Sequence, residues 1–215
     1  MDIIYLGHSC FLIRAKKARL VTDPYGGSVG FIQAKTKADI VTVSHNHSDH
    51  YDLSRIEGES MEIKGPGEYE IKGVSVFGRK TFHDKERGAK RGKNTVYVIQ
   101  IGDIRICHLG DLGHKLSQKQ LDWLDGVDVL MIPVGGFYTI GPEEAWEIIK
   151  EINPSIVLPM HYRAKGMKES FDKLASLEDF MKAIDTELPR KEKKLSLKKL
   201  ELPEETEIVI LERKE

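Results

Sequence analysis

The chain has 215 residues, of which 40% are hydrophobic and 31% are charged, and its formal net charge is −1. This balance is typical of a soluble globular protein and excludes a disordered chain or a uniformly basic nucleic-acid-binding surface. No apolar run approaches the roughly 18 residues of a membrane span, and the first residues lack a signal-peptide pattern. Cys10 and Cys107 lie in strand-like runs, so two buried free thiols in a cytoplasmic protein are favoured over a disulfide.

The first half of the chain is predicted to consist of short strands separated by turns. Their β-branched and aromatic residues, bounded by turn-forming residues, place the strands at Ile3–Leu6, Cys10–Ala15, Arg19–Thr22, Ile40–Val43, Glu62–Lys64, Glu68–Lys72, Val74–Arg79, Thr95–Ile101 and Ile104–His108. The last two are expected to form a hairpin about Gly102 and Asp103.

The second half is predicted to alternate between helices and strands. Helices are expected at Ser117–Leu124, Pro142–Ile152 and Ser176–Thr186, and strands at Val127–Pro133, Ser155–Pro159 and Thr206–Leu211. A basic stretch, Arg190–Lys199, is interpreted as a solvated face with nucleic-acid contact as the alternative. Strands first and then alternating elements favour an α/β fold with sheet packed on sheet and helices outside. One domain spanning residues 1–215 is expected.

The residues that carry chemistry directly follow one of these strands. Three histidines and one aspartate, His45, His47, Asp49 and His50, fall within six residues. In extended backbone residues i and i+2 share a face, so His45 and His47 can bind one ion together. Where the chain then turns, Asp49 and His50 can face a second ion. Imidazole and carboxylate groups at this density are costly to bury unpaired, and a divalent metal satisfies them.

The pattern His-x-His-x-Asp-His resembles the signature of the metallo-β-lactamase fold superfamily. There the signature is followed in chain order by a lone His, a Gly-Asp and a final His, each at a strand end. This sequence supplies His83, Asp111 after Gly110, and His161 in that order. The resemblance covers about residues 1–165 and implies a four-layer αβ/βα sandwich with two metal ions. It implies that His45, His47 and His83 hold the first ion, that Asp49, His50 and His161 hold the second, and that Asp111 bridges them.

The resemblance also implies a metal-dependent hydrolase in which a metal-activated water is the nucleophile. Asp49 and Asp111 are then the catalytic residues, and no Ser or Cys nucleophile is needed. Zinc is the favoured ion, although imidazole-rich sites also accept manganese or iron. The redox-active di-iron branch of the superfamily usually carries Glu at the second motif position, so His47 disfavours that branch.

Further histidines and one aspartate are candidates for supporting roles. His108 competes with His83 for the first metal, but its place inside a strand favours His83. His8 lies in a Gly-His-Ser turn similar to one in the lactonase-like branch, which includes ascorbate-phosphate lactonases and relatives of lipid-cleaving phosphodiesterases. His8 and Asp23 are expected to orient ligands, with an ordinary turn histidine as the alternative for His8. His114 is either a substrate contact or a surface residue.

Cations flank His83 in the segment of residues 85–93, among them Arg87, Lys90 and Arg91. They would attract an anionic substrate such as a phosphate ester or a phosphorylated lactone. A solvated loop and a mobile lid are the alternatives. We therefore predict a hydrolase of a small anionic ester, lactone or phosphodiester. A nucleolytic phosphodiesterase and a non-catalytic metal-binding regulatory domain are the alternatives, and the near-neutral charge disfavours nucleic acid as a partner.

Overall fold

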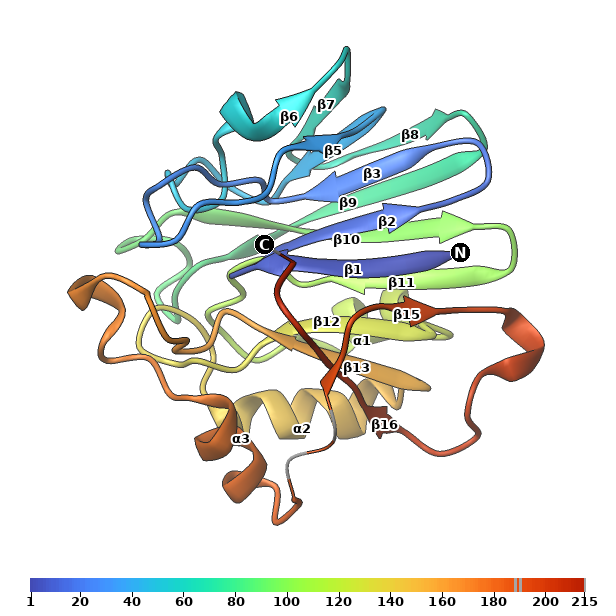
Figure 1. The fold of residues 1–215 in the computed structure, drawn as a ribbon. Helices are drawn as coiled ribbons and strands as arrows, with labels where there is room; N and C mark the ends of the chain where they lie inside the picture. The colour runs from blue at the N-terminus through green and yellow to red at the C-terminus, as the bar shows by residue number, and fades with distance from the viewer. Residues whose placement is uncertain (188, 190, 215) are drawn as a thin grey trace.

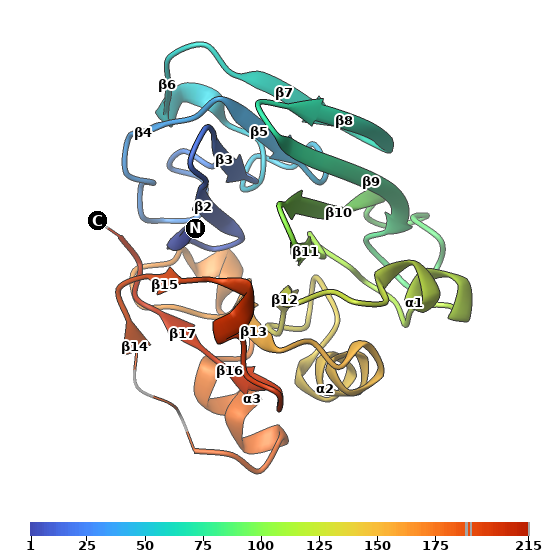
Figure 2. The same cartoon turned by 90° about the vertical axis from the view of Figure 1, so that its right-hand side faces the viewer.

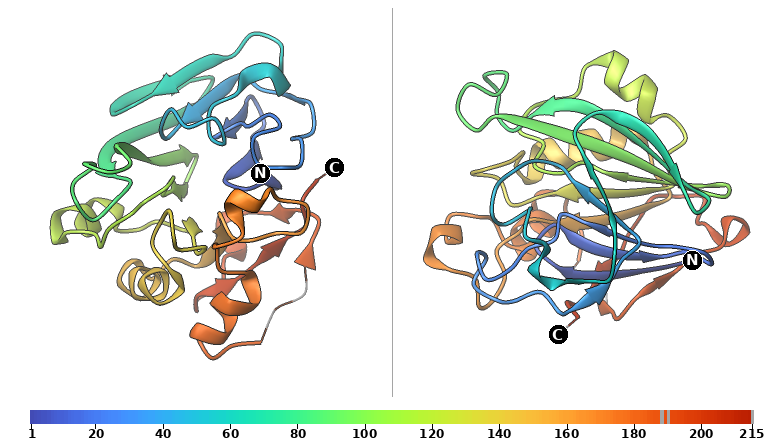
Figure 3. Two further views of the ribbon diagram at one scale, coloured as in Figure 1. Left: turned by 90° about the vertical axis from the view of Figure 1, so that its left-hand side faces the viewer. Right: turned by 90° about the horizontal axis from the view of Figure 1, so that it is seen from above.

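Two β-sheets face one another in the computed structural model, which describes residues 1–187, 189 and 191–214 (Figure 1). The first sheet has the order β15 (Leu195–Ser196), β1 (Asp2–Gly7), β2 (Cys10–Arg14), β3 (Arg19–Thr22), β5 (Ile40–Val43) and β7 (Met61–Lys64). The second has the order β16 (Glu207–Ile208), β13 (Ile156–Met160), β12 (Val129–Pro133), β11 (Ile104–His108), β10 (Lys93–Ile101), β9 (Val74–Phe82) and β8 (Gly67–Ile71). The sandwich is seen from its end in Figure 3.

The helices α1 (Gln118–Leu124), α2 (Pro142–Ile152) and α3 (Leu177–Ala183) lie on the outer side of the second sheet (Figure 2). Helix α2 begins with a proline in its first turn, where a missing N–H costs nothing. It buries Ala145, Ile148 and Ile149 in the central core. Helix α3 begins as predicted at Ser176, whose side chain accepts a hydrogen bond from the Asp179 N–H.

Alternate residues of β1 face two different layers, as the pleat of a strand requires. Ile3 and Tyr5 pack into the core between the sheets, whereas Ile4 and Leu6 belong to a second cluster outside the first sheet. Segments without an α-helix cover that cluster: the 3-10 turns η1 (Leu53–Arg55) and η2 (Glu169–Phe171), and the short pair β4 (Thr36–Lys37) and β6 (Ile56–Glu57) (Figure 2). The predicted α/β sandwich is confirmed, with one outer layer thinner than expected among the described residues.

The C-terminal part differs from the sequence prediction in detail. Part of the basic stretch forms β14 (Lys191–Glu192) and β15, and β15 pairs with β1 at the sheet edge; Arg190 lies outside the described residues. The last predicted strand divides at Val209 into β16 and β17 (Ile210–Leu211), and β17 pairs with β14. A third 3-10 turn, η3 (Lys199–Glu201), joins β15 to this region.

Two sequence predictions about composition can be compared directly with the structure. Cys10 and Cys107 are free and buried, as predicted. Among the described residues, no helix combines the length and the apolar character that crossing a membrane would need.

The strands that precede the predicted ligands end at one edge of the sandwich. Strands β11, β12 and β13 run parallel, so their carboxyl ends meet there. Strand β5 leads into residues 44–50, β9 ends directly before His83, and β13 ends directly before His161. The sheets therefore place side chains that are far apart in the chain on one rigid edge.

Candidate metal centre

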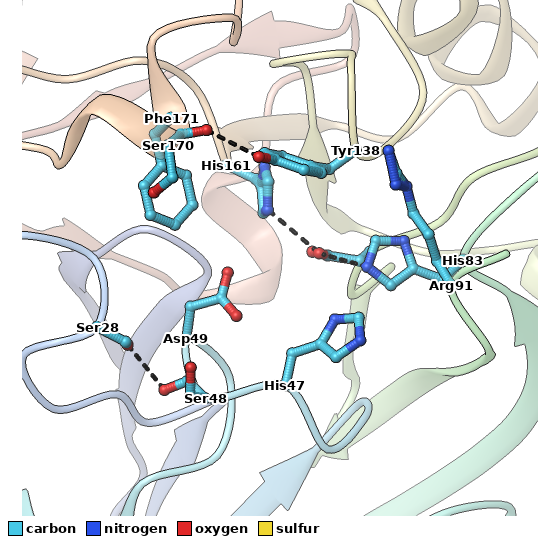
Figure 4. Close-up of a pocket in the computed structure, with 11 residues that line it drawn as sticks. Ser28, His47, Ser48, Asp49, His83, Arg91, Tyr138, His161, Ser170 and Phe171 are labelled. Atoms are coloured by element: carbon cyan, nitrogen blue, oxygen red, sulfur yellow. Dashed lines mark hydrogen bonds and ion pairs between the residues drawn. The ribbon is translucent and has the colours of Figure 1, made fainter.

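The predicted ligands form two groups at this edge. The ligand atoms of His45, His47 and His83 all lie within 4.8 Å of one another. A second group with the same spacing consists of Asp49, His50, His161 and, in addition, His8. Figure 4 shows His47, Asp49, His83 and His161 pointing into the same cleft. Each group has the composition and spacing of a metal site.

Asp111 lies between the two groups. Its Oδ2 is 3.2 Å from the Nε2 atoms of His50, His83 and His161, and 3.8 Å from that of His45. Burial raises the pKa of this carboxyl, but the neighbouring imidazoles hold it well below its usual range. Asp111 is therefore an ionised carboxylate in contact with both groups, which is the position of a bridging ligand.

A tight turn brings Asp111 into this position. Gly110 has a φ of +56°, and a Cβ there would lie 2.4 Å from the Asn94 Oδ1 atom. That same oxygen accepts a hydrogen bond from the Asp111 N–H, and the Asn94 amide donates to the Leu109 carbonyl. The sequence analysis missed Asn94. An amide just before the largely apolar run Val96–Ile99 of strand β10 is the signal that could have indicated it.

Asp23 lies behind two of the imidazoles and is linked to both. Its carboxylate accepts hydrogen bonds from His50 Nδ1 at 2.8 Å and from the Ser44 hydroxyl at 2.5 Å, and the Ser44 Oγ in turn contacts His45 Nδ1 at 2.9 Å. Both imidazoles thus carry a proton on Nδ1, which leaves Nε2 as the atom that can face a metal. Asp23, His45 and His50 also form a third group whose possible ligand atoms lie within 4.8 Å of one another, so the orienting role of Asp23 stays a prediction.

The chemistry of these side chains fits divalent metal ions. The buried atoms His45 Nε2, His50 Nε2 and Asp111 Oδ1 have no hydrogen-bond partner among the described residues. An unpartnered buried polar atom costs about 1–3 kcal/mol, so several that lie close together fit a site that binds cations. Burial also lowers the pKa of His45 to about 3. Its imidazole is therefore neutral at pH 7, the form that binds a metal.

The three remaining histidines lie in different surroundings. His8 is buried, and its Nε2 is 3.2 Å from Asp49 Oδ2, so it either binds the second metal or holds Asp49. His108 Nε2 is 2.8 Å from the Ser9 carbonyl, outside both ligand groups, whereas its competitor His83 lies inside one. His114 accepts from the Phe82 N–H and contacts the Lys115 carbonyl, and it does not line the cleft.

The cleft over the metal centre has a volume of about 310 Å³. Besides candidate ligands, its walls consist of Ser28, Ser48, Arg91, Tyr138, Ser170 and Phe171. The Tyr138 hydroxyl donates to the Ser170 carbonyl at 2.8 Å, which ties two loops together across the wall (Figure 4). The sequence analysis did not identify Tyr138 or Phe171. No local pattern distinguishes them from ordinary core aromatics.

Residues 84–93 form a hydrogen-bonded turn organised by Asp84. Asp84 accepts hydrogen bonds from the backbone N–H groups of Glu86, Gly88, Lys90 and Arg91. Although partial desolvation raises the pKa of Asp84, these four donors lower it to about 2. The sequence analysis did not consider Asp84.

The three cations that were expected to contact substrate, Arg87, Lys90 and Arg91, have different surroundings in this turn. Arg91 lines the cleft, with its guanidinium 5.0 Å from the Tyr138 ring centre. Arg87 lines an adjoining groove. Lys90 pairs with Glu86 and lines neither the cleft nor the groove, so its contact with substrate stays a prediction. The turn directs the Lys90 side chain towards a neighbour on its own segment.

Comparison with known proteins gives the family. The family described as "Beta-lactamase superfamily domain" matches residues 2–161. The chain belongs to this superfamily. A UPF0173 metal-dependent hydrolase of Thermoplasma acidophilum is 31% identical over 188 residues, covering 75% of this chain and 83% of that protein. One from Thermoplasma volcanium is 33% identical over 190 residues, with the same shares.

A solved structure of the superfamily supports the same assignment. A structure from Thermotoga maritima, described as a candidate Zn-dependent hydrolase of the metallo-β-lactamase superfamily, is 37% identical to this chain with a TM-score of 0.78. The match covers 98% of this chain and 97% of that structure. The predicted superfamily and fold are confirmed, and so is the enzyme class of metal-dependent hydrolase.

Proposed function

We propose that this superfamily member hydrolyses a small anionic ester, lactone or phosphodiester at a centre of two divalent ions, most simply zinc. The observation that carries the proposal is the position of Asp111, whose Oδ2 lies 3.2 Å from histidines of both ligand groups. His45, His47 and His83 would hold one ion, Asp49, His50 and His161 the other, and Asp111 would bind both. Such ions, when bound, lower the pKa of water and polarise a carbonyl or phosphoryl oxygen.

Asp49 is the residue best placed to orient a water molecule in the cleft. Its side chain is 19% exposed and lines the cleft, whereas that of Asp111 is 2% exposed. Burial raises the pKa of Asp49, but His50 and His8 lower it by more, so it is a carboxylate at neutral pH. As an ionised carboxylate at the cleft it can accept a hydrogen bond and so orient a water molecule there. His8, within hydrogen-bond distance of Asp49 Oδ2, holds that carboxylate in place.

The cleft walls support a small anionic substrate. A volume of about 310 Å³ is at the lower end of the range for small-molecule sites. Arg91 contributes a positive charge to the wall, and Tyr138 and Phe171 contribute aromatic surface. The cation would bind the acid group of a substrate, and the rings would pack on its apolar part.

A panel of substrates tests the proposal. The metal-reconstituted protein is assayed with an aryl ester, an aromatic lactone, p-nitrophenyl phosphate and bis(p-nitrophenyl) phosphate. We expect turnover of at least one class that disappears on chelation and returns with metal. Asp111→Asn should reduce it by at least about a thousandfold, since the remaining amide is a poor ligand for two ions.

Asp103→Asn is the matched control, because Asp103 is exposed in the turn between β10 and β11. It should retain wild-type turnover. The proposal fails if a fully metal-loaded protein turns over no class, or if Asp111→Asn is as active as Asp103→Asn.

A further inference from the structure

A basic groove adjoins the metal cleft. It has a volume of about 870 Å³ and shares His47 and Arg91 with the cleft, so the two spaces lie next to each other at these side chains. Its walls come from the end of β5 with the following residues 44–47, the end of β7 with the following turn, the end of β9, the turn of residues 84–93, and the start of β10. The ring of Phe82 lies among these walls.

The groove concentrates positive charge. Lys64, Lys80, Arg87, Arg91 and Lys93 line it, and no Asp or Glu among the described residues does. The whole chain has 33 basic and 34 acidic side chains, so this imbalance is local. A concave surface lined by charges of one sign raises the local concentration of ions of the opposite sign.

Several of the cations that line the groove form no ion pair with an acidic side chain. In the part of the chain that the structure describes, no acidic side chain pairs with Lys80, Arg87 or Lys93. Lys85 and Lys90, on the same turn but outside the groove, pair with Glu144 and Glu86. The carboxylate of Asp84 is already occupied by backbone donors. Of the cations that line the groove, Lys64 pairs with Glu62 at 3.1 Å, whereas Lys80, Arg87 and Lys93 have no described acidic partner.

The turn that presents these cations is organised in advance. Arg87 has a φ of +57°, and the turn is closed by hydrogen bonds from Gly92 N to Gly88 O and from His83 N to Gly92 O. Arg91 is held at the junction of the two spaces beside Tyr138 (Figure 4), with its guanidinium donating to the Phe137 carbonyl at 3.2 Å. A site that needs no reordering loses less entropy when it binds.

We infer that this groove binds a second anionic group of the substrate, a phosphate, while the bond to be broken lies in the metal cleft. Clustered Lys and Arg donors suit phosphate oxygens, and the Phe82 ring suits an apolar or aromatic spacer between the two groups. The substrate class is then a small molecule that carries a phosphate at a distance from its hydrolysable bond. This inference rests on the proposed function.

Two nucleotides that differ by one phosphate test the groove without any hydrolysis. Thymidine 5′-monophosphate and thymidine 3′,5′-bisphosphate are titrated calorimetrically into the metal-loaded protein. We expect the bisphosphate to bind on the order of tenfold more tightly, because it adds charge-assisted contacts. Arg87→Ala/Lys93→Ala should remove this preference, and added salt should weaken it.

Lys85→Ala/Lys90→Ala is the matched control, since it removes the same number of exposed charges from the same turn. It should keep the preference for the bisphosphate. Equal affinity for the two nucleotides, no binding of the bisphosphate, or a preference that survives in Arg87→Ala/Lys93→Ala would overturn the inference. Tighter binding of the bisphosphate by a protein that hydrolyses no substrate would count against the proposed function instead. An active enzyme that does not prefer the bisphosphate would count only against the role of the groove.

Discussion

The metal centre and the basic groove lie side by side but are built in opposite ways. His45 and His50 are buried, and each is held through its Nδ1 atom by a network that ends on Asp23. Arg87 and Lys93 are exposed, and no acidic side chain that the structure describes pairs with either. The first region depends on contacts among several strands of both sheets, whereas the second depends mainly on one turn and two strand ends.

This difference separates the chemistry from the choice of substrate. Changes in the buried network should alter metal binding and folding together, because the same residues serve both. Changes in the groove should alter which ligand binds while the fold and the metals remain. A scaffold of this kind can keep one reaction type and change its substrate through exposed residues.

Among substitutions that test this difference, the largest effect on metal binding is expected at His83. His83→Ala should weaken metal binding by more than about a hundredfold, since it removes a ligand rather than a supporting group. His108→Ala should lower the free energy of unfolding by about 1–3 kcal/mol, because it removes a buried hydrogen bond to the Ser9 carbonyl. The metal content of His108→Ala should stay close to that of the wild type. Metal loss in His108→Ala with retention in His83→Ala would reverse the assignment.

An intermediate effect is expected at Asp23. Asp23→Asn replaces one carboxylate oxygen with a donor that faces Ser44 Oγ or His50 Nδ1. Metal affinity, measured by competition with a chelator, should fall by about 10- to 100-fold. Asp103→Asn again serves as the control. An affinity within twofold of the wild type would show that Asp23 does not position the ligands.

The smallest effect is expected at Asp84, which holds the turn beside the groove. Asp84→Asn should lower the melting temperature slightly and speed hydrogen exchange at the Glu86, Gly88 and Lys90 amides, with metal content unchanged. Because its folded-state pKa is depressed to about 2, the carboxylate stabilises the fold above its unfolded pKa of about 3.9, and this contribution is lost as the pH falls through 2. The difference in stability between wild type and variant should therefore be constant from pH 7 to 5. A difference that vanishes by pH 5 would contradict the account.

The ligand pattern could be predicted because each candidate directly follows a strand. Local sequence predicted the end of β5 and placed the end of β13 within one residue, whereas β9 runs on from the predicted end at Arg79 to Phe82, and the structure brings the side chains after these strands to one edge. The preference for His83 over His108 follows from the same principle. A side chain inside a strand such as His108 points into the layer that the strand packs on, not past the sheet edge.

The other features of the site could not be predicted from the sequence, because they depend on contacts between segments that lie far apart in the chain. Asn94 acts on the turn at Gly110 only because β10 pairs with β11, and His8 reaches Asp49 only through the turn between β1 and β2. The separation of Lys90 from Arg87 depends on how Asp84 folds the turn between them. A row of cations in a sequence does not show which of them lack a counter-charge.

The most direct test of the account is the metal content of the protein, measured by elemental analysis after purification without chelators or an affinity tag. We predict close to two equivalents of zinc, manganese or iron per chain, before or after reconstitution. One equivalent or none after reconstitution would contradict the two-metal centre bridged by Asp111.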